Sequence, residues 1–186
     1  MQQLSTEELR LMRRRMQIVF QDPFSSLNPR IRVGDAIAEV LQVHSIVPSD
    51  AVADRVAELL RQVGLDPSRR GQFPHEFSGG ERQRLVIARA LAVEPQMLLC
   101  DEPVSSLDVS IQAQILDLLG RLQAELRLAY LFISHDIRVI LQVCDRVAVM
   151  KDGRFVEVGP VHEVLHQPRH AYTQQLLACS PPDPRQ

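Results

Sequence analysis

The chain has 186 residues, is 45% hydrophobic and 24% charged, and carries a formal net charge of -2. This length favours a single domain with one core, and the composition is that of a soluble globular protein. The small net charge gives no general attraction to nucleic acid, and no apolar run reaches the roughly 20 residues that span a membrane. Because the polar, acidic start also lacks a secretory signal, we predict a cytoplasmic protein that reaches a membrane only through a partner.

Hydrophobic periodicity and turn residues divide the chain into successive elements. Up to residue 77 we expect a helix over 6–15, a strand over 17–20, a loop over 24–30, helices over 33–43 and 51–63, and turns over 65–77. From residue 78 we expect helices over 80–93, 110–126 and 136–144, strands over 97–101 and 130–134, a hairpin over 147–158 with a D-G turn, and short helices near 161–166 and 171–179. Apolar strands that alternate with helices predict an α/β fold with a mostly parallel sheet.

A candidate phosphate-binding loop opens the helix expected over 80–93. Ser78 can cap this helix, and Gly79 and Gly80 let a ligand approach the backbone with no Cβ atom in the way. Free N–H groups at a helix start attract phosphate. Many helices begin with a small capping residue, so the run becomes specific only through the residues that follow it, Glu81 to Arg84.

Two adjacent carboxylates, Asp101 and Glu102, end the apolar strand over 97–101. Ligands bind at the carboxyl ends of strands in α/β sheets, and Mg²⁺ prefers a few carboxylates together with water and phosphate oxygens. One carboxylate can therefore hold the metal ion while the other orients or deprotonates an attacking water. The alternative interpretation is a pair of solvated acids at a strand end.

Two further polar residues stand at strand ends. His135 follows the strand over 130–134, where an imidazole can donate a hydrogen bond to a phosphate oxygen. Gln21 follows the strand over 17–20, shortly before Pro23. A lone histidine or glutamine in such a place is more often a surface residue, so both gain weight only from their position. The 34-residue spacing between Asp101 and His135, with one helix and one strand in between, favours the functional interpretation.

The order of these motifs resembles that of the ATP-binding cassette (ABC) ATPases. FSGGERQR is similar to the family's signature, with Glu81 where glutamine is commoner, and the strand ending in Asp101 and Glu102 is similar to its Walker B segment. The resemblance implies ATP and Mg²⁺ as cofactors. It further implies Asp101 and Gln21 as Mg²⁺ ligands, Glu102 as the catalytic base, His135 and Gln21 as further catalytic residues, and Ser78, Gly79, Gly80, Glu81 and the D-loop residue Asp108 as groups that bind ATP across a subunit interface.

The resemblance implies a P-loop NTPase fold of the ABC type that is incomplete. The sequence holds no Walker A pattern G-x-x-x-x-G-K-[ST], and its one lysine, Lys151, stands in a turn. The implied organisation is a partial nucleotide-binding domain over 1–180, with a Q-loop and helical signature subdomain over about 22–93, a Walker B, D-loop and switch core over 94–160, and C-terminal helices and tail over 161–186. Without the P-loop strand, we expect exposed apolar surface, marginal stability and neither tight binding nor hydrolysis of ATP by the chain alone.

Three stretches narrow the resemblance to importers. FQDPFSSLNPR around Gln21, PHEFSGG, and the ending over 170–177 resemble ATPase subunits of bacterial dipeptide and oligopeptide importers, and nickel and glutathione importers share much of this pattern. The implied partners are a second ABC ATPase subunit, membrane permeases and, indirectly, an extracytoplasmic binding protein, but no nucleic acid. The implied location is the inner face of the bacterial cell membrane.

Three interpretations stay open: a fragment of an importer ATPase, a truncated subunit that lends its signature and D-loop to an intact partner, and a non-transport ABC ATPase.

Overall fold

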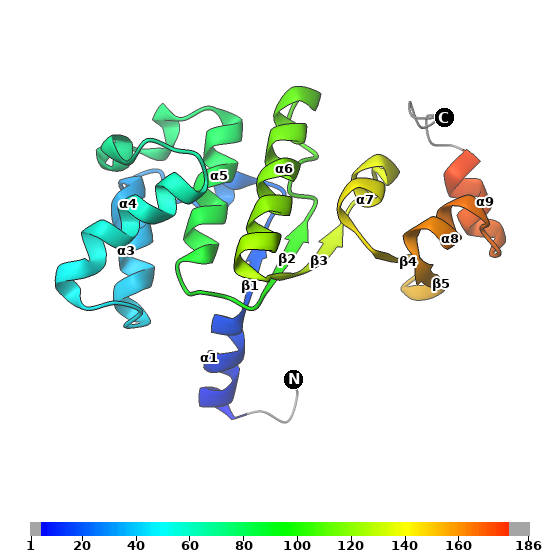
Figure 1. Cartoon of the computed structure of the whole chain (residues 1–186), viewed down its shortest axis with the longest axis horizontal. Coiled ribbons are helices and arrows are strands. Elements are labelled where there is room, and N and C mark those ends of the chain that lie inside the picture. Colours follow the sequence, from blue (N-terminus) through cyan, green and yellow to red (C-terminus); the bar gives the residue numbers. More distant parts are fainter. Residues whose placement is uncertain (1–4, 179–186) are drawn as a thin grey trace. The chain divides into compact units, whose positions relative to one another are not determined.

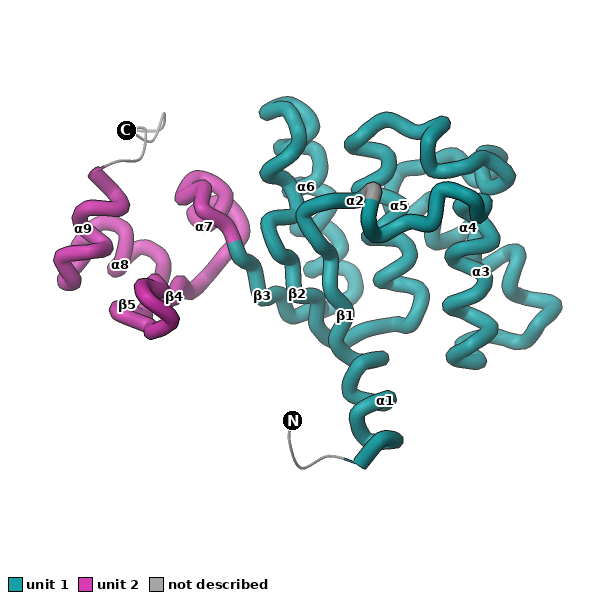
Figure 2. The backbone as a smooth tube through the Cα atoms, turned by 180° about the vertical axis from the view of Figure 1, so that it is seen from behind, with its two compact units in different colours: residues 1–133 teal, residues 134–186 magenta. Residues whose placement is uncertain are grey.

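The computed structural model describes residues 5–178 and divides after Ile133 into two compact units (Figure 2). The first unit contains α1 (Thr6–Arg15), β1 (Met16–Val19), α2 (Pro23–Ser26), α3 (Val33–Val43), η1 (Ser49–Ala51), α4 (Val52–Gln62), η2 (Pro67–Gly71), η3 (Pro74–Glu76), α5 (Gly79–Leu91), β2 (Met97–Asp101), α6 (Val109–Leu126) and β3 (Ala129–Ile133). The second contains α7 (Ile137–Val143), β4 (Arg146–Lys151), β5 (Arg154–Pro160), α8 (Val161–His166) and α9 (Ala171–Ala178). The subdomains predicted from the motifs divide the chain at other places and stay predictions.

The first unit is built on a parallel sheet with the strand order β1-β2-β3 (Figure 1). Ile18 pairs with Leu99, and Leu99 pairs with Leu131, so the three strands are in register and their carboxyl ends meet at one edge. Parallel neighbours need a crossover connection, which α6 supplies between β2 and β3. The predicted α/β fold with a parallel sheet is confirmed.

One face of this sheet forms the core of the first unit. Leu98 and Cys100 on β2 are fully buried, as are Ile115 and Leu119 on α6. The hydroxyl of Tyr130 on β3 donates a hydrogen bond of 2.8 Å to the backbone oxygen of Leu119. Helix α5 directly precedes β2, and α6 connects β2 to β3. Both helices cover the face of the sheet on which Leu98 and Cys100 lie (Figure 1).

The other face of the sheet is apolar and largely open. Ile18, Leu131 and Ile133 keep 42%, 47% and 46% of their surface exposed. Ile18 and Leu131 are the cross-strand neighbours of Leu99, so these side chains form one row across the three strands. The exposed apolar surface expected from the sequence is therefore found on this face.

Helix α4 ends at a glycine in the left-handed conformation. Gly64 follows α4 with φ of 74°, and its N–H donates to Arg61 O at 2.9 Å. The N–H of Leu65 donates to Leu60 O, also at 2.9 Å. This pair of hydrogen bonds is a Schellman motif, which needs a left-handed residue at the position of Gly64. The helix predicted over 51–63 is thus confirmed to within one residue at each end.

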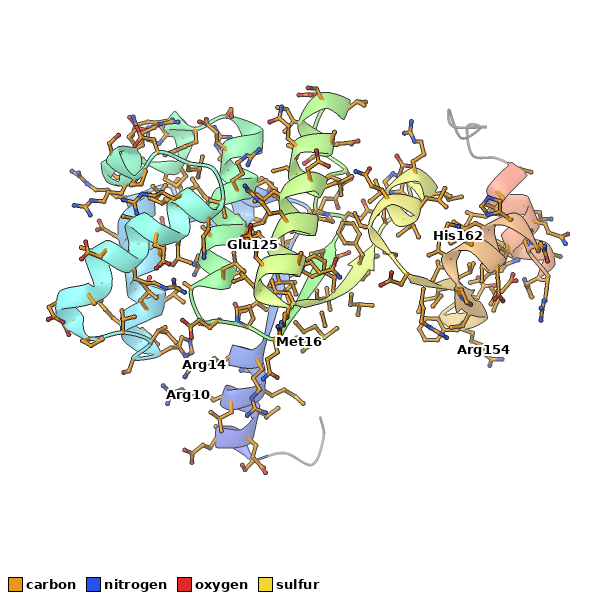
Figure 3. All side chains as sticks on the ribbon, viewed as in Figure 1. Arg10, Arg14, Met16, Glu125, Arg154 and His162 are labelled. Atoms are coloured by element: carbon orange, nitrogen blue, oxygen red, sulfur yellow. The ribbon has the colours of Figure 1, made fainter. Side chains whose placement is uncertain are left out.

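Helix α1 has no buried residue and is tied to the helical region by two arginines (Figure 3). Arg10 donates to Val43 O at 3.5 Å, and Arg14 donates to Val93 O at 3.4 Å. These carbonyl groups lie at the C-terminal ends of α3 and α5, where the helix dipole favours positive charge. Two arginines of α1 thus have partners within the same unit.

The second unit contains the predicted hairpin. Asp152 and Gly153 have φ of 49° and 75°, the left-handed pair that a type I′ turn requires, and β4 pairs antiparallel with β5. The carboxylate of Glu157 on β5 accepts the N–H groups of Arg169 and His170 at 2.9 and 3.1 Å. These hydrogen bonds fix the segment that leads into α9. The last predicted helical residue, Cys179, lies outside the described residues.

One predicted loop is wrong. Residues 24–30 were expected to be irregular, but Pro23–Ser26 forms the short helix α2. Proline at the first helical position has its φ already set, and the hydroxyl groups of Ser25 and Ser26 donate to Asp22 O at 2.9 and 3.1 Å. Within residues 5–178, no helix is long and apolar enough to cross a membrane.

Candidate functional site

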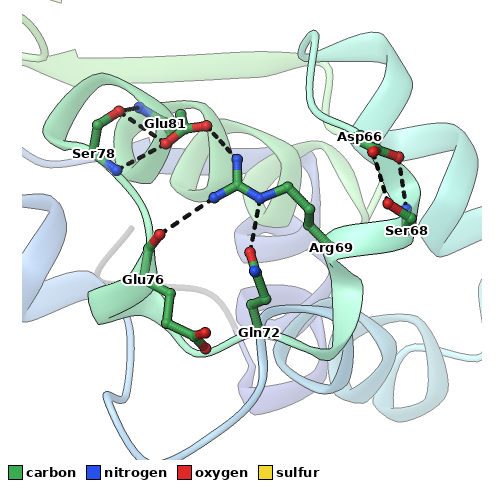
Figure 4. A network of polar contacts seen from close by, with 7 residues as sticks. All are labelled: Asp66, Ser68, Arg69, Gln72, Glu76, Ser78 and Glu81. Carbon is green, nitrogen blue, oxygen red and sulfur yellow. Dashed lines mark hydrogen bonds and ion pairs between the residues drawn. The ribbon is translucent and has the colours of Figure 1, made fainter.

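Ser78 and Glu81 fix the start of α5 through a reciprocal capping box (Figure 4). The backbone N–H and the hydroxyl of Ser78 reach Glu81 Oε2 at 2.8 and 3.0 Å, and Glu81 N–H donates to Ser78 Oγ at 3.3 Å. The hydrogen bond from Ser78 N–H, and then the contact with Arg69, lower the pKa of the Glu81 carboxyl. The loop is therefore held at a helix N-terminus, the kind of position that favours anion binding.

Arg69 of η2 holds the other oxygen of this carboxylate (Figure 4). Its Nη1 contacts Glu81 Oε1, its Nε donates to Gln72 Oε1 at 2.7 Å, and its Nη2 donates to Glu76 O at 3.3 Å. The guanidinium carbon lies 4.1 Å from the ring centroid of Phe77. No sequence motif pointed to Arg69, because it lies 12 residues before Glu81 in a turn region.

The two glycines of the loop have different surroundings. A Cβ atom at Gly79 would lie 3.5 Å from Leu107 Cδ2, an ordinary contact, and Gly79 is exposed. A Cβ atom at Gly80 would lie 2.5 Å from Ile111 Cγ2, and Gly80 is buried. Close packing between α5 and α6 thus accounts for glycine at position 80, whereas ligand approach stays the prediction for Gly79.

The D-loop, residues 103–108, lies between Glu102 and the start of α6 and contacts other motifs of the first unit. The carboxylate of Asp108 caps α6 by accepting Ile111 N–H at 3.0 Å. The hydroxyl of Ser106 donates to Gln21 O at 3.4 Å. A Cβ atom at Gly79 would lie 3.5 Å from Leu107, so the D-loop lies between the signature loop and Gln21, two residues after β1. The structure thus brings Ser78–Glu81, Asp108 and Gln21 to one connected region.

Glu102 adopts an unusual backbone conformation at the end of β2. Its φ is 47°, in the left-handed region that non-glycine residues seldom occupy. Its N–H donates to Ile133 O at 2.9 Å, and its carbonyl accepts the N–H and hydroxyl of Ser105 at 3.3 and 3.1 Å. The backbone of Glu102 is thus held between the end of β3 and the start of the D-loop. Strained backbone of this kind is common at functional sites.

The predicted Mg²⁺ ligands, Asp101 and Gln21, come from neighbouring strands. Val19 pairs with Cys100, so Asp101 and the residues just after Val19 emerge at the same edge of the sheet. In residues 5–178, no group of three or more His, Cys, Asp or Glu side chains is arranged to hold a metal ion. A site with one or two carboxylates completed by water and phosphate suits Mg²⁺, so the donor set fits this ion.

His135 belongs to the second unit and follows Ile133 by two residues. The next residue, Asp136, caps α7 by accepting Arg138 N–H at 2.9 Å. The side-chain hydrogen bonds from Arg138 lower the pKa of Asp136. Residue 136 therefore has a local structural role, and the catalytic role of His135 stays a prediction.

A groove beside Gln21 was not foreseen from the sequence. It has a volume of about 630 Å³ and is lined mainly by β1, α2, α3 and α5, including Phe20, Val40, His44 and Arg89. Arg89 is fixed by donating to Ser26 O at 2.8 Å. Burial, followed by the nearby arginines of α1, lowers the pKa of His44. No sequence motif pointed to His44, which directly follows α3 and lines this groove.

The α/β fold with its parallel sheet is consistent with a P-loop NTPase fold, and the comparison with known families agrees. The ABC transporter family model matches residues 1–105, which is more than half of the chain. The chain belongs to the ABC transporter family. A solved structure, CbiO1 from Clostridium perfringens, described as part of the ABC transporter complex CbiONQ, is similar with a TM-score of 0.78 and 32% identity, covering 88% of this chain and 64% of that one.

More particular similarity is to proteins named glutathione import ATP-binding protein GsiA. The chain is 52% identical over 178 residues to the protein of Escherichia coli K12, which covers 96% of this chain and 29% of that protein. The protein of Salmonella choleraesuis is 51% identical over the same length and coverage. The chain thus spans less than a third of the length of these relatives.

Proposed function

We propose that this chain acts in the ATP-binding part of an importer of the ABC type. The observation that carries the proposal is the connected region of the first unit, in which the D-loop lies next to the N-terminus of α5 through Leu107 and contacts Gln21 through Ser106. Similarity to glutathione import ATP-binding proteins supports the importer class. The chain would face a second ABC ATPase subunit, so that its signature loop closes over ATP held by the P-loop of that subunit.

Each motif then has a defined task. Ser78 and the first N–H groups of α5 bind the terminal phosphate of ATP from the opposite subunit. Asp101 and Gln21 would hold Mg²⁺, which supplies charge neutralisation for the phosphate oxygens. Glu102 orients or deprotonates the attacking water, and His135 donates a hydrogen bond to the phosphate. Positioning and charge stabilisation account for most of the rate enhancement in such a site.

A mixing experiment tests the signature role. The chain is combined with a glutathione import ATP-binding protein that keeps its P-loops but has lost its own signature serines. Phosphate release from MgATP is expected to appear on mixing, and Ser78→Arg in this chain is expected to abolish it. Arg61→Ala, on the exposed side of α4, serves as the matched control and should keep the activity. Failure of the unsubstituted chain to restore hydrolysis would contradict the proposal.

The same mixture separates an importer ATPase from a truncated subunit that lends only its signature and D-loop. The sequence has no Walker A lysine, which is the observation that keeps the second function open. If this chain supplies only the signature, Glu102→Gln should leave hydrolysis unchanged while Ser78→Arg abolishes it. If its own carboxylates also act, Glu102→Gln should lower hydrolysis in a second mixture, in which the partner keeps its signature serines.

The groove beside Gln21 is proposed to receive a cytoplasmic segment of the permease. Phe20 and Val40 give it apolar walls. Phe20 directly precedes Gln21, the glutamine of the Q-loop, so an occupant would lie next to that loop. Val40→Arg is expected to reduce co-purification with the permease subunits from membranes. Glu39→Arg, on the exposed side of the same helix, should not reduce it. Equal recovery of the two variants would argue against this groove as the contact.

The names of the relatives support a proposal on the substrate class. Because those names specify glutathione import, we propose that the complete transporter imports peptide-sized substrates and that the chain sits on the inner face of the cell membrane through its permease. Uptake of labelled glutathione and of an unrelated tripeptide into cells carrying the chain with its permeases would test this. Uptake of neither compound would contradict the proposed substrate class.

A further inference from the structure

Glu81 places a negative charge where the proposed function requires a phosphate to bind. Its carboxylate Oε2 accepts both donors of Ser78, at 2.8 and 3.0 Å, directly at the N-terminus of α5. An anion there interacts favourably with the helix dipole. A second anion approaching the same N-terminus is repelled by the first unless the carboxylate is compensated. The loop therefore needs a cation that contacts Glu81 without covering Ser78.

Arg69 meets this requirement. Its guanidinium contacts the other carboxylate oxygen, Oε1, so Oε2 keeps its hydrogen bonds from Ser78. The arginine is itself held by Gln72 at 2.7 Å and by the Phe77 ring at 4.1 Å. The side chains of Arg69 and Glu81 are only 30% and 31% exposed, so solvent screens this pair less than a pair on the open surface.

We propose that Arg69 is a positioning residue of the phosphate site: it neutralises the charge of Glu81, so that a triphosphate meets a helix N-terminus without net negative charge. This inference rests on the proposed function, because it assumes that the signature loop binds a phosphate. The capping box is made by contacts between Ser78 and Glu81 alone, through Glu81 Oε2, whereas Arg69 contacts Glu81 Oε1. Loss of Arg69 should therefore change the charge of the loop more than its shape.

The test is a titration of the full chain with sodium tripolyphosphate, followed by the amide signals of Gly79, Gly80 and Glu81 in ¹H–¹⁵N spectra. The unsubstituted chain should show saturable shifts of these signals. Arg69→Ala should weaken the affinity by roughly threefold to tenfold, the range expected for an uncompensated charge at a helix N-terminus. Arg69→Ala combined with Glu81→Gln should return the affinity to within about twofold of Glu81→Gln alone, since the charge to be neutralised is then gone.

Three outcomes decide the matter. Equal affinity of Arg69→Ala and the unsubstituted chain would overturn the inference and leave the proposed function intact. A double variant as weak as Arg69→Ala would show that Arg69 shapes the loop rather than neutralising it, which also overturns the inference. Absence of shifts in the unsubstituted chain would remove the phosphate site and the inference with it. If Arg69→Ala does not fold, Arg69→Gln makes the same charge change with a longer polar side chain and is read in the same way.

Discussion

Gly80 and Ile111 pack so closely that a Cβ atom at Gly80 would lie 2.5 Å from Ile111 Cγ2. Real Cβ atoms do not approach a neighbour that closely, so α5 and α6 can meet here only because residue 80 has no side chain. Gly79 differs, since its Cβ position lies 3.5 Å from Leu107 Cδ2. The second glycine of the signature loop is therefore required by the packing of α5 against α6.

Gly80→Ala should destabilise the chain. In a helix, glycine to alanine normally stabilises by about 1 kcal/mol, but overpacking a buried contact costs about 1–3 kcal/mol. The free energy of unfolding in urea is thus expected to fall for Gly80→Ala and to stay equal or rise for Gly79→Ala, the matched control. Adding Ile111→Ala to Gly80→Ala should cost less than the sum of the two single changes. A Gly80→Ala chain as stable as Gly79→Ala would contradict the packing explanation.

The positive φ of Glu102 can be tested with two neutral replacements. Asparagine tolerates the left-handed conformation, whereas a β-branched residue does not. Both Glu102→Asn and Glu102→Val remove the carboxylate, so their difference isolates the backbone. We expect Glu102→Val to be less stable than Glu102→Asn by about 1–2 kcal/mol in chemical denaturation. Equal stabilities would mean that residue 102 does not hold this conformation in solution.

The apolar face of the sheet should tolerate polar residues that the core does not. Leu131 is 47% exposed on β3, whereas Leu98 is fully buried on β2. Leu131→Ser is expected to cost less than about 1 kcal/mol of stability and to reduce binding of a hydrophobic dye, while Leu98→Ser should cost about 3 kcal/mol or more. Dye fluorescence and urea denaturation measure both effects. A large loss of stability for Leu131→Ser would show that this face is covered in solution.

Local sequence patterns predicted the elements better than the contacts between them. The helix Val33–Val43 and the strand Met97–Asp101 were predicted with the observed bounds, because apolar periodicity and flanking turn residues are local signals. The missed helix α2 depends on side-chain hydrogen bonds to Asp22 O that periodicity does not record.

The candidate site shows the same limit. Its motifs could be found because each is a short run, Ser78–Glu81 or Asp101–Glu102, beside a predictable element. Arg69 could not be found, since its pairing with Glu81 depends on how η2 folds back onto α5. The link from Ser106 to Gln21 joins residues 85 positions apart, and only the packed fold brings them together.

The isolated chain should bind MgATP poorly. Its residues supply no Walker A lysine, and removal of even one preorganised donor from such a site can cost about 10²–10³ in rate. Calorimetric titration of MgATP into the chain is expected to give no micromolar affinity and no hydrolysis. A glutathione import ATP-binding protein, measured in the same buffer, is the positive control. Micromolar binding by the isolated chain would mean that residues outside the identified motifs bind the phosphates.

The stability of the chain should depend on pH through Glu81. The hydrogen bond from Ser78 N–H, with Arg69, lowers the pKa of this carboxyl below its ordinary value of 4.5. The folded chain therefore takes up this proton less readily than the unfolded chain, so the stabilisation is complete above pH 4.5 and is lost as the pH falls through the lower folded-state pKa. Urea denaturation between pH 6 and pH 3 should show a smaller loss of stability for Glu81→Gln than for the unsubstituted chain. Glu125→Gln, which removes an exposed carboxylate of α6, controls for the change in net charge (Figure 3). If Glu81→Gln follows the same pH curve as Glu125→Gln, the capping box does not carry the acid sensitivity.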